Sequence, residues 1–212
     1  MVRFEDVIEL TPTISGTGAY LNAHTNLTEI RDAMDLLWRN HISPDKVTLG
    51  TAFYGRAFTA TSSKCVTPGC NYLSGANKQP CSGEISVVLN SEILDIMKRT
   101  GAKPTLYKDA AVKVLTYDQD QWVAYDDADT LKLKAEFARS QCLGGVFVWA
   151  VSHDTHNAQF SKALAKVAGR KYIALEDNTD GYMPVVSTHP QCKWTNCQEG
   201  MQLPTSVHME ID

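Results

Sequence analysis

The sequence predicts an α/β protein, because two short apolar runs alternate along the chain with stretches of helical periodicity. The runs, residues 47–55 and 143–151, are bounded by turn-forming residues, which is typical of buried parallel strands. Apolar residues recur at helical spacing in 27–40, 129–141 and 157–168. Each run therefore has a helix on either side, as in a sheet covered by helices.

The segment between the two runs predicts a small inserted α+β module. Residues 59–83 are rich in Gly, Pro, Ser and Asn and are expected to form loops. A helix is expected over 85–99, with Gly101 as its stop. Residues 112–117 and 121–125 are predicted to form a hairpin.

The first helix has a recognisable start. Asn26 is followed three residues later by Glu29, a pattern that resembles a capping box. Asn26-Leu27-Thr28 is also formally a glycosylation sequon, and a plain helix cap is at least as good an explanation of the asparagine. The third helix is expected to be capped by an aspartate.

Composition narrows the class of partner. Of 212 residues, 43% are hydrophobic and 21% charged, which favours a folded core over disorder. The formal charge of −4 disfavours nucleic acid and fits a neutral or weakly charged ligand. The longest apolar run, nine residues, is far short of the roughly 20 that a membrane span needs.

The cysteines and the N-terminus indicate different compartments. Residues 1–9 carry acids where a signal peptide is apolar, so no leader is predicted and the literal expectation is cytosolic. Clustered loop cysteines favour disulfides, hence an oxidising compartment and an N-terminus that lies further upstream. Spacings of x4, x10 and x4 without a C-x2-C pair disfavour zinc. The candidate disulfide cysteines are Cys65, Cys70, Cys81, Cys142, Cys192 and Cys197.

Four separated motifs together resemble fungal chitinases of glycoside hydrolase family 18, and most of all the killer-toxin-like subgroup. In chain order they are YLNAHTNLTEI at 20–30, LGTAFYGR at 49–56, YDDADT at 125–130 and GGVFVWAVS at 144–152. The resemblance covers about residues 18–168. It implies a secreted, extracellular protein that acts on chitin, a polymer of N-acetylglucosamine, without a cofactor.

The resemblance also implies an architecture. The two strands are then the last two of a TIM (β/α)8 barrel, so the fold class becomes a partial barrel with an inserted α+β chitinase insertion domain. Two strands cannot close a barrel, and both are expected to present unpaired edges. The implied division is an unassigned segment at 1–20, barrel parts at 21–56 and 118–168, the insertion domain at 57–117 and a polar, cysteine-containing tail at 169–212.

Three residues are implied to bind the substrate. Trp149, at the end of the second strand, matches the tryptophan that forms the floor beneath the sugar at the cleavage point. An indole face can bury the apolar C–H surface of a sugar and leave its hydroxyls free for hydrogen bonds. Tyr54 and Arg56 match the substrate-contacting pair of the Tyr-Gly-Arg strand end. From the residues alone, Trp149 would be a core residue and Arg56 a partner in a surface ion pair.

Two further patterns are weaker. His153 and His156 are three residues apart at a strand–helix turn, with no third ligand in view, so no metal site is predicted and Asp154 is expected to cap the loop. Gly144-Gly145 could suggest a phosphate loop in a protein unrelated to sugars. The pair precedes its strand, however, which is the wrong geometry for that site.

The acid of the implied reaction is not in this sequence. Family 18 enzymes cleave by substrate assistance, in which the N-acetyl carbonyl attacks the anomeric carbon while a glutamic acid protonates the leaving oxygen. That glutamate ends a D-x-x-D-x-D-x-E motif, which no acidic cluster here matches. No catalytic residue is therefore assigned, and two hypotheses stay open. The chain is the C-terminal part of a chitinase, inactive alone, or a catalytically dead protein that binds chitin oligosaccharides.

Overall fold

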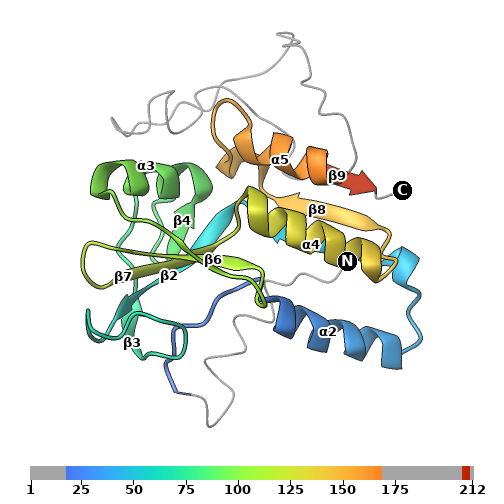
Figure 1. Cartoon of the computed structure of the whole chain (residues 1–212), viewed down its shortest axis with the longest axis horizontal. Helices are drawn as coiled ribbons and strands as arrows, with labels where there is room; N and C mark the ends of the chain where they lie inside the picture. The colour runs from blue at the N-terminus through green and yellow to red at the C-terminus, as the bar shows by residue number, and fades with distance from the viewer. Residues whose placement is uncertain (1–17, 169–206, 211–212) are drawn as a thin grey trace.

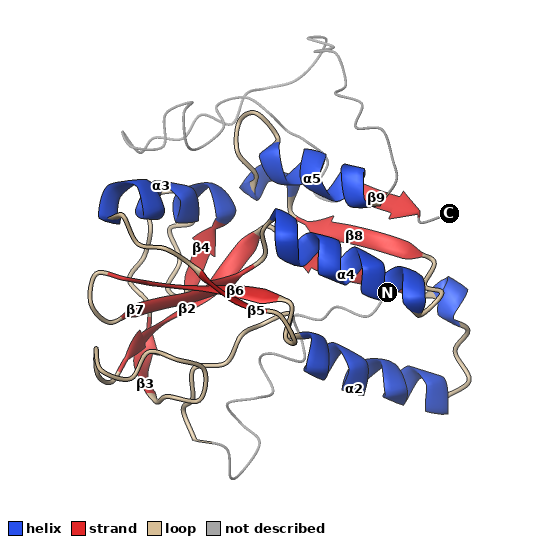
Figure 2. Ribbon diagram, in the orientation of Figure 1, coloured by secondary structure: helices blue, strands red, loops and turns tan. Residues whose placement is uncertain are grey.

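The computed structural model describes residues 18–168 and the backbone of 207–210. Within these residues the chain forms a three-stranded and a six-stranded sheet, with helices packed around both (Figure 1). Figure 2 shows that helices and strands are mixed along the whole described chain, as the α/β prediction requires. None of the described helices is long and apolar enough to cross a membrane.

The three-stranded sheet contains the predicted parallel pair. Strand β1 (Thr48–Ala52) runs parallel to β8 (Gly145–Trp149), with Thr48 opposite Gly145 and Ala52 opposite Trp149. The backbone of β9 (Val207–Glu210) pairs antiparallel with the other edge of β8. The prediction of unpaired edges on both strands is therefore wrong for β8. Among the described strands, the outer edge of β1 has no partner.

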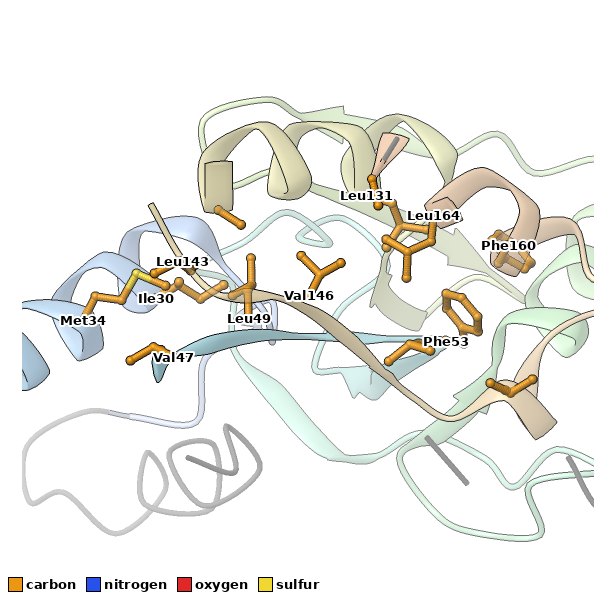
Figure 3. Close-up of a cluster of buried hydrophobic side chains, with 14 residues drawn as sticks. Ile30, Met34, Val47, Leu49, Phe53, Leu131, Leu143, Val146, Phe160 and Leu164 are labelled. Atoms are coloured by element: carbon orange, nitrogen blue, oxygen red, sulfur yellow. The ribbon is translucent and has the colours of Figure 1, made fainter. Parts of the chain in front are cut away.

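Three helices bury one face of this sheet (Figure 1): α2 (Leu27–Arg39), α4 (Ala128–Ser140) and α5 (Gln159–Val167). Each helix presents an apolar stripe, and the stripes meet the strands in one core (Figure 3). Full burial of such a side chain stabilises the fold by about 1.5–3 kcal/mol. Core side chains from the three helices are Ile30, Met34, Leu131, Ala138, Phe160 and Leu164, and those from β1 and β8 include Leu49, Val146 and Val148.

The helix caps largely follow the sequence. Asn26 caps α2, but its side chain accepts from the Thr28 amide rather than from the Glu29 amide that a capping box uses. Asp127 caps α4, as expected of an aspartate, by accepting from the Thr130 amide and from the amide one residue before it.

The apolar run at 47–55, predicted as one strand, contributes to two strands, because the chain changes sheets at Phe53. Before this residue β1 pairs with β8, and after it β2 (Tyr54–Ala60) pairs antiparallel with β7 (Gln121–Tyr125). The Phe53 amide donates to the Trp149 carbonyl at 3.0 Å, and the Phe53 carbonyl accepts from the Asn90 amide at 2.9 Å. An apolar run alone does not reveal this switch, because both strands are buried.

The six-stranded sheet extends from β2 to β7 in the order β3-β2-β7-β6-β5, with β4 paired to β2. Its hairpin of β6 (Val112–Tyr117) and β7 has the predicted bounds. Helix α3 (Asn90–Thr100) covers one face through Ile93 and Ile96, and ends at Gly101 in the left-handed conformation as predicted. The remaining strands are β3 (Tyr72–Gly75), β4 (Val87–Leu89) and β5 (Thr105–Tyr107), and 3-10 turns occupy Pro44–Lys46 and Val151–His153.

Two predictions in this module need correction. The helix expected over 85–99 starts at Asn90, because residues 87–89 pair with β2 as β4. The segment 59–83, expected to be loop, contains β3, whose antiparallel pairing with β2 is not visible as alternation in so short a run.

The cysteine predictions are confirmed only in part. Cys65 and Cys70 form a disulfide, and Cys81 is also disulfide-bonded. Cys142 is free and exposed, so its inclusion among the disulfide candidates was wrong. It lies in the turn after α4, away from the loop that holds the Cys65–Cys70 pair. The candidates Cys192 and Cys197 lie outside the described residues, as does most of the predicted tail.

Candidate functional site

Trp149 is the most exposed large residue at the carboxyl end of the parallel pair. Its side chain is 40% exposed, whereas Val146 and Val148 of the same strand are buried in the helix-facing core. Since side chains alternate along a strand, Trp149 lies on the face of β8 that the helices do not cover. Phe147 shares this face and packs over Gly50, where an added Cβ would lie 3.0 Å from its ring. The peptide bond from Trp149 to Ala150 is cis.

Tyr54 and Arg56 start the next strand along the chain. Phe53 hydrogen-bonds to Trp149, so the residue that follows it, Tyr54, is held near the end of β8. Tyr54 is buried, and the Arg56 guanidinium lies 5.8 Å from the centre of its ring. Within the described residues Arg56 forms no ion pair, and its buried Nε has no hydrogen-bond acceptor. Among the described residues, Arg56 therefore carries a positive charge without a carboxylate partner.

Two imidazoles flank Tyr54. The His24 ring lies 5.3 Å from the Tyr54 ring, and the His153 ring meets it edge-on at 5.8 Å. Burial lowers the pKa of His24 to about 3, with smaller contributions from the charges of Lys134 and Arg56 and a small opposing one from the Tyr54 backbone. Burial likewise lowers the pKa of His153 to about 4. Both rings are therefore neutral near pH 7.

A buried polar network lies next to this cluster. The Asp126 carboxylate forms an ion pair with Lys134, and both side chains are fully buried. The same carboxylate accepts from the hydroxyls of Thr25 and Thr130 at 3.1 and 2.8 Å. The Asn90 side chain donates to the Asp126 carbonyl at 2.9 Å. The network thus fixes the chain next to His24, the start of α4 and the start of α3 relative to one another.

Between the two histidines of the strand–helix turn, Asp154 has a structural role. Asp154 is buried, and its carboxylate accepts from the amides of Phe160 and Ser161 at 3.0 and 2.7 Å. These are amides of the first turn of α5, so Asp154 satisfies donors at the start of that helix. It also accepts from the Thr155 amide at 2.6 Å, which is the loop capping that was predicted. In the described part of the chain, no three His, Cys, Asp or Glu side chains gather in a way that could hold a metal ion.

The sequence predicted three residues of this cluster and missed others. Trp149, Tyr54 and Arg56 lie around one strand end, and their role in substrate binding stays a prediction. His24, Asn90 and Lys134 were not singled out, because each reaches the site through a contact with a residue 30 or more positions away in the chain. A signal did exist for His24, which lies inside the motif at 20–30.

Comparison with known proteins decides the family. The sequence profile of "Glycosyl hydrolases family 18" matches residues 12–154, more than half of the chain. The chain belongs to this family. Among its relatives in Penicillium expansum, "Probable chitinase LysM18" is 25% identical over 90% of this chain, and "Secreted chitinase LysM12" is 26% identical over 66% of it.

Solved structures agree on the fold. A class V chitinase from Nicotiana tobaccum in complex with NAG4 superposes with a TM-score of 0.66 at 19% identity over 74% of this chain. Human YKL-39, described as a pseudo-chitinase with retained chitooligosaccharide binding properties, gives 0.60 at 24% identity over 66%. The fold is that of the family 18 chitinases, a TIM barrel with an insertion domain, of which β1 and β8 form part of the barrel.

This chain spans only part of each of these proteins. It covers 14% of LysM18, 10% of LysM12, 46% of the tobacco chitinase chain and 40% of the YKL-39 chain.

Proposed function

We propose that this chain carries a sugar-binding part of a secreted family 18 protein that acts on chitin. The observation that carries the proposal is the exposed indole of Trp149 at the carboxyl end of β8, on the strand face that the helices leave uncovered. Barrel enzymes place their sites at this end of the strands. An indole in that position offers an apolar surface for the C–H face of N-acetylglucosamine.

Arg56 and Tyr54 complete the proposed contact. The half-buried Arg56 side chain ends in a guanidinium, a group whose N–H donors suit sugar oxygens, and the Tyr54 ring next to it contacts the rings of His24 and His153. Neutral imidazoles leave the site with little charge beyond Arg56, in keeping with an uncharged oligosaccharide. Secretion is supported by the Cys65–Cys70 disulfide, which belongs to an oxidising compartment.

Calorimetric titration of the purified chain with the tetramer of N-acetylglucosamine tests the proposal. Trp149→Ala is expected to weaken binding by about 2 kcal/mol, roughly thirty-fold in Kd. Leu73→Ala removes another exposed apolar side chain, 73% exposed on β3, and is expected to leave Kd unchanged. Absence of saturable binding by the unchanged chain, or equal binding by Trp149→Ala, would contradict the proposal.

Catalysis by these 212 residues alone is not part of the proposal, because the chain has no D-x-x-D-x-D-x-E motif to supply the acid. Incubation with chitin oligosaccharides is expected to yield no shorter products on chromatography, and turnover by the purified chain would overturn that expectation. The alternative, a binding protein without hydrolysis, is supported by the fold shared with YKL-39. Sequencing the complete transcript separates the two, since only a chitinase carries the acid motif in frame.

A further inference from the structure

The Asn26-Leu27-Thr28 tripeptide is a potential modification site that the proposed sugar contact does not involve. It is the only N-x-S/T sequence, with x other than Pro, in the 212 residues. Such a tripeptide is the acceptor for N-glycosylation. Leu27 is buried in the core at the start of α2, whereas Thr28 is exposed and Asn26 half-buried. The two side chains that the transfer reaction recognises thus lie at the surface of the folded chain.

The helix cap and the modification use different atoms of Asn26. The side-chain oxygen, Oδ1, accepts the capping hydrogen bond from the Thr28 amide at 3.0 Å. Within the described residues, the side-chain nitrogen, Nδ2, makes no hydrogen bond. An N-linked glycan replaces one hydrogen of Nδ2 and leaves Oδ1 an amide oxygen. The cap therefore survives modification, and cap and glycan acceptor are compatible roles for one residue.

A second observation places the chain where the reaction occurs. Cys65 and Cys70 are joined by a disulfide with a sequence separation of 5, and Cys81 is disulfide-bonded too. Disulfides form on entry into the secretory compartment of eukaryotic cells, which is also where N-glycans are added.

We propose that Asn26 is an N-glycosylation site of the secreted protein. Its Nδ2 forms a bond to the anomeric carbon of a lipid-pyrophosphate-linked oligosaccharide, and loses one proton. The anomeric carbon–oxygen bond breaks, and the lipid pyrophosphate leaves with that electron pair. The product keeps α2 capped, and the modified residue directly precedes Leu27, whose amide donates to the Ala110 carbonyl at 3.0 Å.

The test expresses the full 212-residue chain behind a cleavable secretion leader in a yeast host. Peptide mapping after treatment with peptide N-glycosidase in heavy-oxygen water marks every modified Asn26 as labelled aspartate. Thr28→Ala is the decisive variant, since it removes the sequon while leaving Asn26 and its cap bond to the backbone amide of residue 28 in place. Thr28→Ser is the matched control that keeps the sequon.

The unchanged chain and Thr28→Ser are expected to carry glycan at Asn26, and Thr28→Ala to carry none. The same digest reports the Cys65–Cys70 disulfide, which shows that the recovered chain entered the oxidising compartment. Chains with this disulfide and an unmodified Asn26, from the medium or from inside the cell, overturn the proposal. Oligosaccharide binding is not a readout, so failure here leaves the proposed function untouched, and the converse holds as well.

Discussion

Replacing Lys134 by Met is expected to destabilise the protein far more than any surface charge change. The Lys134 ammonium is fully buried and is paired with the equally buried Asp126 carboxylate. Burial lowers the pKa of Lys134, and the Asp126 carboxylate partly offsets this effect. Lys134→Met preserves most of the side-chain volume but leaves the Asp126 carboxylate with only the hydroxyls of Thr25 and Thr130.

The expected loss in the free energy of unfolding follows from the Asp126 carboxylate, which stays buried without its positive partner. Removal of one partner of a buried ion pair costs about 3–5 kcal/mol, because the remaining charge stays in a medium that solvates it poorly. For a domain of this size that corresponds to a fall in Tm of roughly 6–20 °C. Adding Asp126→Asn to Lys134→Met removes the charge and is expected to recover part of the loss.

Urea unfolding followed by circular dichroism measures these differences. Lys132→Met is the matched control, since it removes a positive charge from the same helix where the side chain is 63% exposed and 3.8 Å from Glu136. That exposed pair contributes less than about 0.5 kcal/mol. Equal losses in Lys132→Met and Lys134→Met would refute the argument that burial sets the cost, as would a double variant less stable than Lys134→Met alone.

Two further changes test the site and the sheet. The pKa of His24 falls from 6.5 to about 3 on folding, so between these values the unfolded chain binds the proton more readily. The free energy of unfolding therefore decreases as the pH is lowered through this range, by up to about 1.4 kcal/mol per pH unit. In His24→Phe that slope, measured by urea unfolding at several pH values, should be shallower; an unchanged slope would contradict the assignment. Gly144→Ala brings a Cβ to 2.2 Å from the Asp45 carbonyl oxygen and should cost about 1–3 kcal/mol. Gly50→Ala, which meets only the Phe147 ring at 3.0 Å, should cost less; the reverse order in thermal unfolding would be inconsistent with these contacts.

The sequence predicted elements whose signal is local. Helices α2, α4 and α5 were recognisable because an apolar stripe at helical spacing and a polar cap lie within one continuous segment. The parallel pair was recognisable because β1 and β8 are apolar runs between turn residues. The hairpin of β6 and β7 has two short runs of strand-forming residues on either side of a turn, which is also a local pattern.

What the sequence did not predict depends on distant pairings. The change of sheet at Phe53 is set by partners at Asn90 and Trp149. Strand β4 and the covering of β8 by β9 likewise require segments far apart in the chain to meet. The site divides in the same way: Trp149, Tyr54 and Arg56 belong to recognisable motifs, whereas the support from His24, Asn90 and Lys134 arises only when three elements fold together.

The single residue between β1 and β2 has a consequence for how the molecule unfolds. The Phe53 amide donates to Trp149 of β8, and the Phe53 carbonyl accepts from Asn90, the first residue of α3. The Phe53 ring is buried against Phe160 in the helix-facing core. Disorder at Phe53 therefore removes a bond to β8 together with a bond to the start of α3, the helix that packs against the six-stranded sheet. The barrel part and the inserted module are therefore expected to melt as one cooperative unit, although they are built on different sheets.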